Sequence, residues 1–246
     1  MKWPVHLLSG MLVAFSLQDP GRADELHDAV IAGKADAVEA LLIAGADVNA
    51  PGDLGSPLHL AAFDGNVEIA RLLIAKQADV NARHEADGAR PLHVAASYNH
   101  AALAALLLDN GAEIDARDAT ARTPLFVAAR LGHVDTARLL LARGADVNAR
   151  SASQITPLHQ AIVNDKIDML GLLLDARPDL EAANQNGETP LHVAAWVGSL
   201  RAIELLVAKG AKLQSRRPDG LTPMLEAQGS QHPEAADLLR RLGATE

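Results

Sequence analysis

The sequence predicts an all-α protein built as a solenoid of about seven stacked helix-turn-helix repeats. A Pro-Leu-His-x-Ala segment or a close variant recurs every 33 or 34 residues, with its prolines at Pro57, Pro91, Pro124, Pro157, Pro190 and Pro223. Aromatic residues make up only 2% of the chain, whereas alanine and leucine are abundant, which suits thin layers of closely packed helices. No linker interrupts the period, so a single elongated domain over 24–246 is favoured over two globular domains.

The first 23 residues have the pattern of a secretory signal peptide. Lys2 precedes an apolar run over 5–17, which is too short to span a bilayer comfortably and is followed by polar, turn-forming residues. We expect cleavage after Ala23, which places the mature chain in the periplasm or outside the cell. Cleavage after Ser16, or retention of 1–23 as a capping helix or membrane anchor, is the alternative.

Each repeat then encodes two helices. In most copies a hydroxyl residue before the proline can cap the first helix, and the proline occupies the first helical position, where its missing N–H is not needed. The second helix carries apolar residues at i, i+3 and i+4, as Ile69, Leu72 and Leu73 do. Gly111 and Gly144 follow such helices at the left-handed position that glycine adopts cheaply. The predicted repeats cover 24–53, 54–87, 88–120, 121–153, 154–186, 187–219 and 220–246.

The repeated segment also indicates a family. Rows such as Thr189-Pro190-Leu191-His192-Val193-Ala194-Ala195, with their period, make the chain resemble ankyrin-repeat proteins over roughly 24–243. The resemblance implies a short projecting β-hairpin loop after each helix pair and a concave groove that binds another protein. Because the exported chain has no cysteine and no Asn-x-Ser/Thr sequon, we expect the bacterial periplasmic type.

Composition and motifs argue against several other classes of function. Without cysteine, disulfides, thiolate catalysis and Cys-bound zinc are excluded, and a net charge of −9 disfavours nucleic-acid binding. No P-loop, dinucleotide or Gly-x-Ser-x-Gly motif occurs. We therefore expect a monomer with no enzymatic activity, no cofactor, no metal site, no nucleic-acid partner and, after cleavage, no membrane contact.

The histidines are interpreted as structural. One per layer, they would lie roughly 10 Å apart, which is too far for two of them to share a metal ion. Five share one position of the repeat: His27, His59, His93, His159 and His192.

Candidate binding residues follow from the resemblance, because the two residues after the paired alanines of ankyrin-like first helices point into the groove and vary with the partner. They are Phe63, Asp64, Ser97, Tyr98, Arg130, Leu131, Val163, Asn164, Trp196 and Val197. Three of the four aromatic residues beyond the N-terminal segment lie here, and aromatic residues anchor interfaces. The alternative is that they cover neighbouring helices at the rim. Phe126 stands at the histidine position and is expected in the core.

A row of arginines is the second candidate surface. An arginine follows the loop segment at four junctions: Arg83, Arg117, Arg150 and Arg216. On an acidic protein such a row would suit a carboxylate-rich partner surface. The alternative is a solvated row that pairs with local Asp and Glu.

The fifth copy, 154–186, is predicted to be the weakest layer of the stack. Gly171 lies inside its second helix, Arg177 replaces the glycine that ends this helix, and Pro178 follows.

The sequence thus predicts a non-catalytic, exported scaffold that recognises a partner protein through its groove and hairpin tips. A secreted effector or immunity factor that inhibits a host or rival protein is the alternative. An accessory domain of a hydrolase is disfavoured, because no unassigned stretch is long enough for a catalytic domain.

Overall fold

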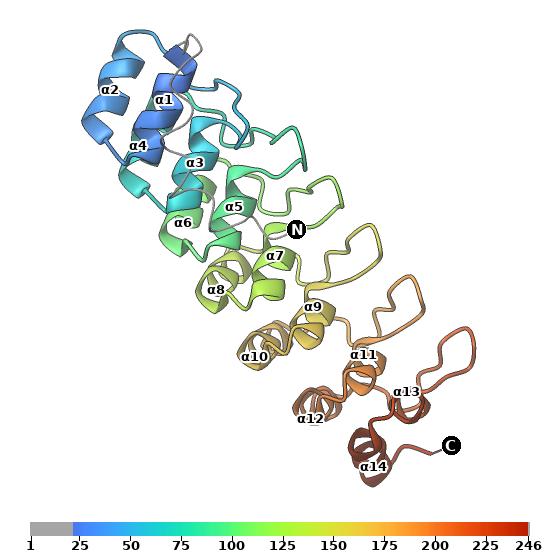
Figure 1. Cartoon of the computed structure of the whole chain (residues 1–246). Coiled ribbons are helices and arrows are strands. Elements are labelled where there is room, and N and C mark those ends of the chain that lie inside the picture. Colours follow the sequence, from blue (N-terminus) through green and yellow to red (C-terminus); the bar gives the residue numbers. More distant parts are fainter. Residues whose placement is uncertain (1–21, 246) are drawn as a thin grey trace.

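The computed structural model describes residues 22–245, which form fourteen α-helices and no strand. The predicted signal segment, except its last two residues, lies outside the described residues. The helices alternate in two rows along an elongated stack (Figure 1). They are α1 (Arg22–Ile31), α2 (Ala35–Ile43), α3 (Pro57–Asp64), α4 (Val67–Ala75), α5 (Pro91–Ser97), α6 (Ala101–Asp109), α7 (Pro124–Leu131), α8 (Val134–Ala142), α9 (Pro157–Val163), α10 (Ile167–Asp175), α11 (Pro190–Trp196), α12 (Leu200–Ala208), α13 (Pro223–Gly229) and α14 (Pro233–Arg241). The predicted solenoid of helix pairs is confirmed.

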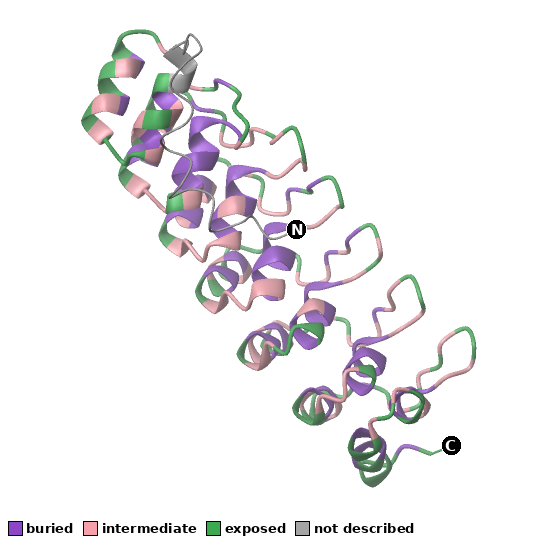
Figure 2. Ribbon diagram, in the orientation of Figure 1, coloured by how far each residue is buried: buried purple, intermediate pink, exposed green. Residues whose placement is uncertain are grey.

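The odd-numbered helices form the centre of the stack, between the projecting loops and the even-numbered helices, which we call the outer helices (Figure 1). Each packs against its even-numbered partner and against the next odd-numbered helix, and a loop projects beside each junction (Figure 1). Buried residues are concentrated along the odd-numbered helices (Figure 2). Their paired alanines, such as Ala61 and Ala62, have no exposed surface, so helix backbones approach closely across one continuous core.

The shared histidines join each layer to the next. His59 Nδ1 accepts a hydrogen bond from the backbone N–H of Ser56 at 3.2 Å, so the ring proton lies on Nε2, which donates to the Ala89 carbonyl at 3.1 Å. His93, His159 and His192 repeat this arrangement. Their predicted structural role is confirmed. Phe126, at the same position, is buried as expected.

The connecting loops have the shape of hairpins but contain no strand within 22–245. The N–H of Asp118 donates to the Arg122 carbonyl at 3.1 Å and closes one loop, while the N–H of Ala119 donates to the Asp87 carbonyl at 2.8 Å and joins it to its neighbour. Isolated bonds of this kind do not build a ladder. Asn81 adds a tie between repeats, since its side chain donates to the Gly111 carbonyl at 3.0 Å and accepts from the Glu113 N–H at 2.9 Å.

The fifth repeat carries an unusual number of strained turns. Gln154, Asp165 and Arg177 adopt positive φ angles of 60°, 49° and 56°. The sixth repeat has glycine at each equivalent position, Gly187, Gly198 and Gly210. Because the left-handed conformation costs a residue with a Cβ roughly 1–2 kcal/mol, these turns support the prediction of a weak fifth layer.

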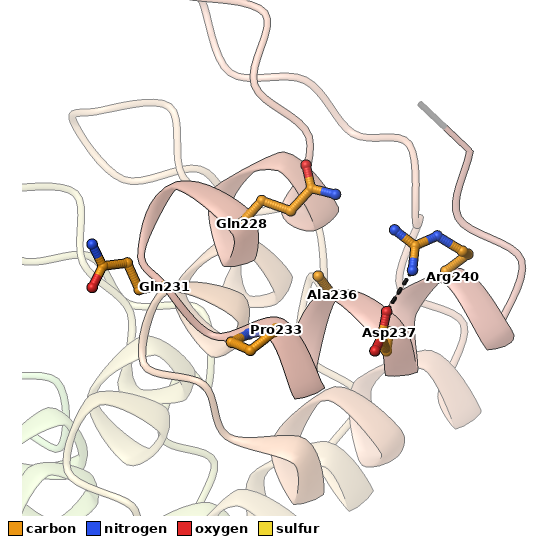
Figure 3. A pocket seen from close by; sticks show the side chains of 6 residues that line it. All are labelled: Gln228, Gln231, Pro233, Ala236, Asp237 and Arg240. Atoms are coloured by element: carbon orange, nitrogen blue, oxygen red, sulfur yellow. Dashed lines mark hydrogen bonds and ion pairs between the residues drawn. The ribbon is translucent and has the colours of Figure 1, made fainter.

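The last repeat ends the stack with polar residues. Gln228 stands where the preceding repeats place the buried Ala195, Ile162 and Ala129, and Arg240 stands where α12 has Val207. With Gln231, Pro233, Ala236 and Asp237 these residues line a shallow hollow, and Arg240 pairs with Asp237 beside it (Figure 3). The hollow marks the side on which a further repeat would stack. Among the described helices, none is both long and apolar enough to cross a membrane.

Candidate protein-binding surface

The last residues of the odd-numbered helices, with the loops that project beside them, form a surface that we call the inner face. In α3, α7 and α11 every residue before these positions is buried. In α11 every residue from Pro190 to Ala195 is buried, whereas Trp196, the last residue, is 50% exposed. The groove candidates taken from the sequence therefore lie at the ends of odd-numbered helices or directly after them.

Val163 and Trp196 form the apolar part of the inner face. They occupy the same position in consecutive repeats, on the neighbouring helices α9 and α11, and Val163 is 46% exposed. An exposed tryptophan has no packing role that would require its size. Val197, by contrast, is half-buried and packs against the core.

Phe63 and Tyr98 are joined to each other. Their rings meet edge to face with centroids 4.5 Å apart, and both residues are half-buried. Tyr98 also stacks over His100 at 6.4 Å, and His100 Nε2 lies 3.0 Å from the Phe63 carbonyl oxygen. Burial raises the pKa of the Tyr98 hydroxyl. This pair therefore contributes to the packing between layers as well as to the surface, as the rim alternative requires.

Arg130 lies near the end of α7, in the layer between the one that carries Tyr98 and the one that carries Val163. It is half-buried, its Nε atom is buried, and no hydrogen bond or ion pair links its guanidinium to any described residue. Burial, and then the charge of Arg122, lowers the pKa of Arg130, while Asp118 opposes this shift. Leu131 beside it is half-buried.

The remaining polar candidates are satisfied locally or face solvent. The Ser97 hydroxyl donates to the His93 carbonyl at 2.9 Å, and the Asn164 amide donates to the Gln160 carbonyl at 2.9 Å. Asp64 is exposed; partial burial of its carboxyl raises the pKa, against the influence of His100. The hydrogen bonds of Ser97 and Asn164 are thus made within the fold, and Asp64 is open to solvent. None of the three residues needs a partner protein to satisfy its hydrogen-bonding groups.

The arginine row lies on the loops and has no carboxylate partner in the part of the chain that the structure describes. Arg117 donates to the Arg150 carbonyl at 2.9 Å, Arg150 to the Ala183 carbonyl at 3.2 Å, and Arg216 to the Gly220 carbonyl at 2.9 Å. Arg83 is exposed. Arg117 and Arg150 thus tie neighbouring loops through backbone oxygens, and no ion pair with a described residue neutralises the row.

Other loop arginines differ in this respect. Arg90 pairs with Glu113 at 2.8 Å, and Arg217 pairs with Glu226 at 2.6 Å and with two further carboxylates. Their charges are neutralised inside the fold. Within residues 22–245 no three acidic or histidine side chains converge in a way that could hold a metal ion.

Comparison with known proteins agrees with this architecture. A sequence profile described as ankyrin repeats, in three copies, matches 26–118, 91–151, 115–184 and 158–245. Protein phosphatase 1 regulatory subunit 27 of Homo sapiens is 38% identical over 74 residues, which are 30% of this chain and 48% of that protein. The protein of the same name from Mus musculus is 39% identical over 67 residues, or 27% of this chain and 44% of that protein. The chain thus matches less than half the length of these curated relatives.

Proposed function

Because this chain belongs to the ankyrin-repeat family, we propose that it is a non-catalytic scaffold that binds a partner protein through its inner face. The half-exposed Trp196, at the end of a helix that is otherwise buried, is the observation that carries this proposal. Aromatic side chains of this kind dominate the free energy of protein interfaces. The regulatory subunits to which the chain is similar carry in their names a role in controlling another protein.

The fold suits such a role because its recognition elements are fixed before binding. The odd-numbered helices are anchored through buried alanines and through the histidine bonds between layers. A surface held in place in this way loses little conformational entropy when a partner docks. The unneutralised arginine row would add long-range attraction for a partner with an acidic surface.

Binding by the inner face can be tested with three single variants, Phe63→Ala, Tyr98→Ala and Trp196→Ala. Each is expected to weaken capture of a partner by roughly 1–4 kcal/mol. Phe63→Ala and Tyr98→Ala each also break the contact between the two rings, and the loss of this contact lowers the unfolding free energy by about 0.5–1.5 kcal/mol. Trp196→Ala is expected to affect binding far more than stability.

A matched control for Trp196 lies in the same repeat. Leu200 begins α12 and is 41% exposed, but it belongs to the outer row of helices. Leu200→Ala is therefore expected to leave partner capture unchanged. Equal binding by wild type and Trp196→Ala, or a loss of binding only in Leu200→Ala, would refute a role for the inner face.

We further propose that the protein is exported and acts in the periplasm or outside the cell, on the strength of the signal-like order of residues 1–23. Cleavage after Ala23 would shorten α1 by two residues and leave its buried residues, Leu26 and Val30, in place. N-terminal sequencing of the protein recovered from its producing cells tests this proposal. Asp24 is the expected first residue, and a soluble cytoplasmic protein that retains Met1 would contradict it.

A further inference from the structure

Arg130 carries a charge that the fold does not neutralise. Within the part of the chain that the structure describes, three arginines have a buried Nε atom without a hydrogen-bond partner: Arg90, Arg130 and Arg217. Arg90 and Arg217 bind carboxylates through their other nitrogen atoms. Among these three arginines, only the guanidinium of Arg130 makes no hydrogen bond or ion pair with a described residue. A partly desolvated guanidinium without a counterion is unfavourable in the free protein, which is why such groups are ordinarily paired.

Asp118, a carboxylate whose charge acts on Arg130, already binds other groups. One carboxylate oxygen accepts hydrogen bonds from the Thr120 N–H, the Thr120 hydroxyl and the Arg122 N–H, and the other accepts from Arg122 Nε at 2.7 Å. Asp118 is 8% exposed, so it has little room for a second cation. Asp118 forms its ion pair with Arg122, so it does not neutralise Arg130.

The surroundings of Arg130 define what could supply the missing charge. The equivalent positions on the next two layers are Val163 and Trp196, both about half exposed, and the preceding layer places Ser97 there, beside the Phe63–Tyr98 pair. Neighbouring helices in such a stack lie about 8–10 Å apart. An extended chain covers that distance in roughly three residues. A ligand that follows the inner face thus meets one cation with apolar surface on either side.

We propose that Arg130 is the receptor for a carboxylate side chain of the partner protein, and that this Asp or Glu lies in an extended segment with a bulky apolar residue about three positions away, packed on Val163 and Trp196. A single carboxylate matches the one uncompensated charge and can bind a guanidinium through two parallel hydrogen bonds. This inference rests on the proposed function, since it assumes that the inner face is where a partner docks.

Peptide display can test the inference before any natural partner is known. A displayed library of random dodecapeptides is selected on the full chain, and the selected peptides are then measured against Arg130→Gln and against Arg138→Gln. Arg138 is the matched control, because it is an exposed arginine of the same repeat on the outer helix α8. We expect the peptides to share an acidic residue near an apolar one, and to bind Arg130→Gln about tenfold or more weakly, with Arg138→Gln unchanged.

A second measurement needs no ligand. If the Arg130 charge has no partner in the free protein, Arg130→Met removes an unfavourable group, and the urea midpoint of unfolding stays level or rises. A clear fall in the midpoint would mean that the fold itself uses the charge and would overturn the inference.

The outcomes also separate this inference from the proposed function. Peptides that bind wild type and Arg130→Gln equally, yet lose affinity for Trp196→Ala, would overturn the carboxylate receptor and leave inner-face binding intact. If the selected peptides bind wild type no better than a variant in which Phe63, Tyr98 and Trp196 are all alanine, both proposals fail.

Discussion

Acid is expected to loosen the stack because protons disrupt the histidine bonds between its layers. His59 and His159 are buried, and burial, as the dominant cause, lowers the pKa of each imidazole from 6.5 to about 4. The geometry explains why the neutral ring is required: a backbone N–H already points at Nδ1, so a proton on that nitrogen would place two donors face to face. Burial also lowers the pKa of His93 and His192.

The size and direction of the effect follow from linkage. Since the folded-state pKa lies below the unfolded-state value, neutrality of these rings stabilises the fold fully above pH 6.5, and this contribution is lost as the pH falls toward 4. A difference of 2.5 pKa units corresponds to about 3 kcal/mol per ring, of which about 2 kcal/mol is lost by pH 5. His59 and His159 together thus lower the unfolding free energy by about 4 kcal/mol between pH 7.5 and 5.

Urea unfolding at pH 7.5 and pH 5.0, followed by circular dichroism, measures this loss. His159→Phe copies the residue that the chain itself has at Phe126, and is expected to reduce the difference between the two pH values by about 2 kcal/mol. Thr123→Ala removes the equivalent cap beside Phe126, where no histidine titrates, so it costs about 1 kcal/mol at both pH values. An unfolding free energy that is the same at pH 7.5 and 5.0, or the same pH difference in wild type and His159→Phe, would mean that protonation of these histidines does not destabilise the stack.

Two further predictions concern the weak layer and the arginine row. Gly171 and Gly144 both have open space where a Cβ would lie, but only Gly144 has a positive φ, of 91°. Gly171→Ala is therefore expected to raise the unfolding free energy by up to about 1 kcal/mol. Gly144→Ala is expected to lower it by about the same amount. By hydrogen exchange, amides of 167–177 are expected to exchange faster than those of 134–144, and equal protection would contradict the weak fifth layer. Changing Arg83, Arg117, Arg150 and Arg216 together to Gln is expected to reduce the salt dependence of partner association, because exposed charges are screened over about 8 Å at physiological ionic strength; the same salt dependence in both proteins would leave the row a solvated surface.

Periodicity is sufficient to predict the helices of this protein. Proline starts most of the first helices because its missing N–H is not needed at the first helical position. Glycine follows many helices because it adopts the left-handed conformation at little cost. The left-handed turns at Gln154 and Asp165 are not predictable in this way, because the stack around them imposes a conformation that neither residue favours. The loops depart from the β-hairpins implied by resemblance, because single backbone bonds replace a ladder.

The sequence does not show which charges of the candidate site are neutralised in the fold. Position in the repeat selects Trp196 and Arg130 equally, since it depends only on spacing. Whether a charge is neutralised depends on distances between residues far apart in the chain, as for Arg90 and Glu113, or on which of two neighbouring arginines reaches Asp118. A repeat pattern gives each of these residues its position in a layer but does not show which of them pair.

Photo-crosslinking from defined positions shows which surface of the protein contacts its partner. A photoreactive phenylalanine analogue is placed at position 163 or 196 on the inner face, and at position 138 or 200 on the outer helices. After irradiation in extract of the producing cells, we expect the same partner protein to be attached through positions 163 and 196 and not through 138 or 200. Attachment through the outer positions with none through 163 and 196 would mean that the partner binds elsewhere than on the inner face.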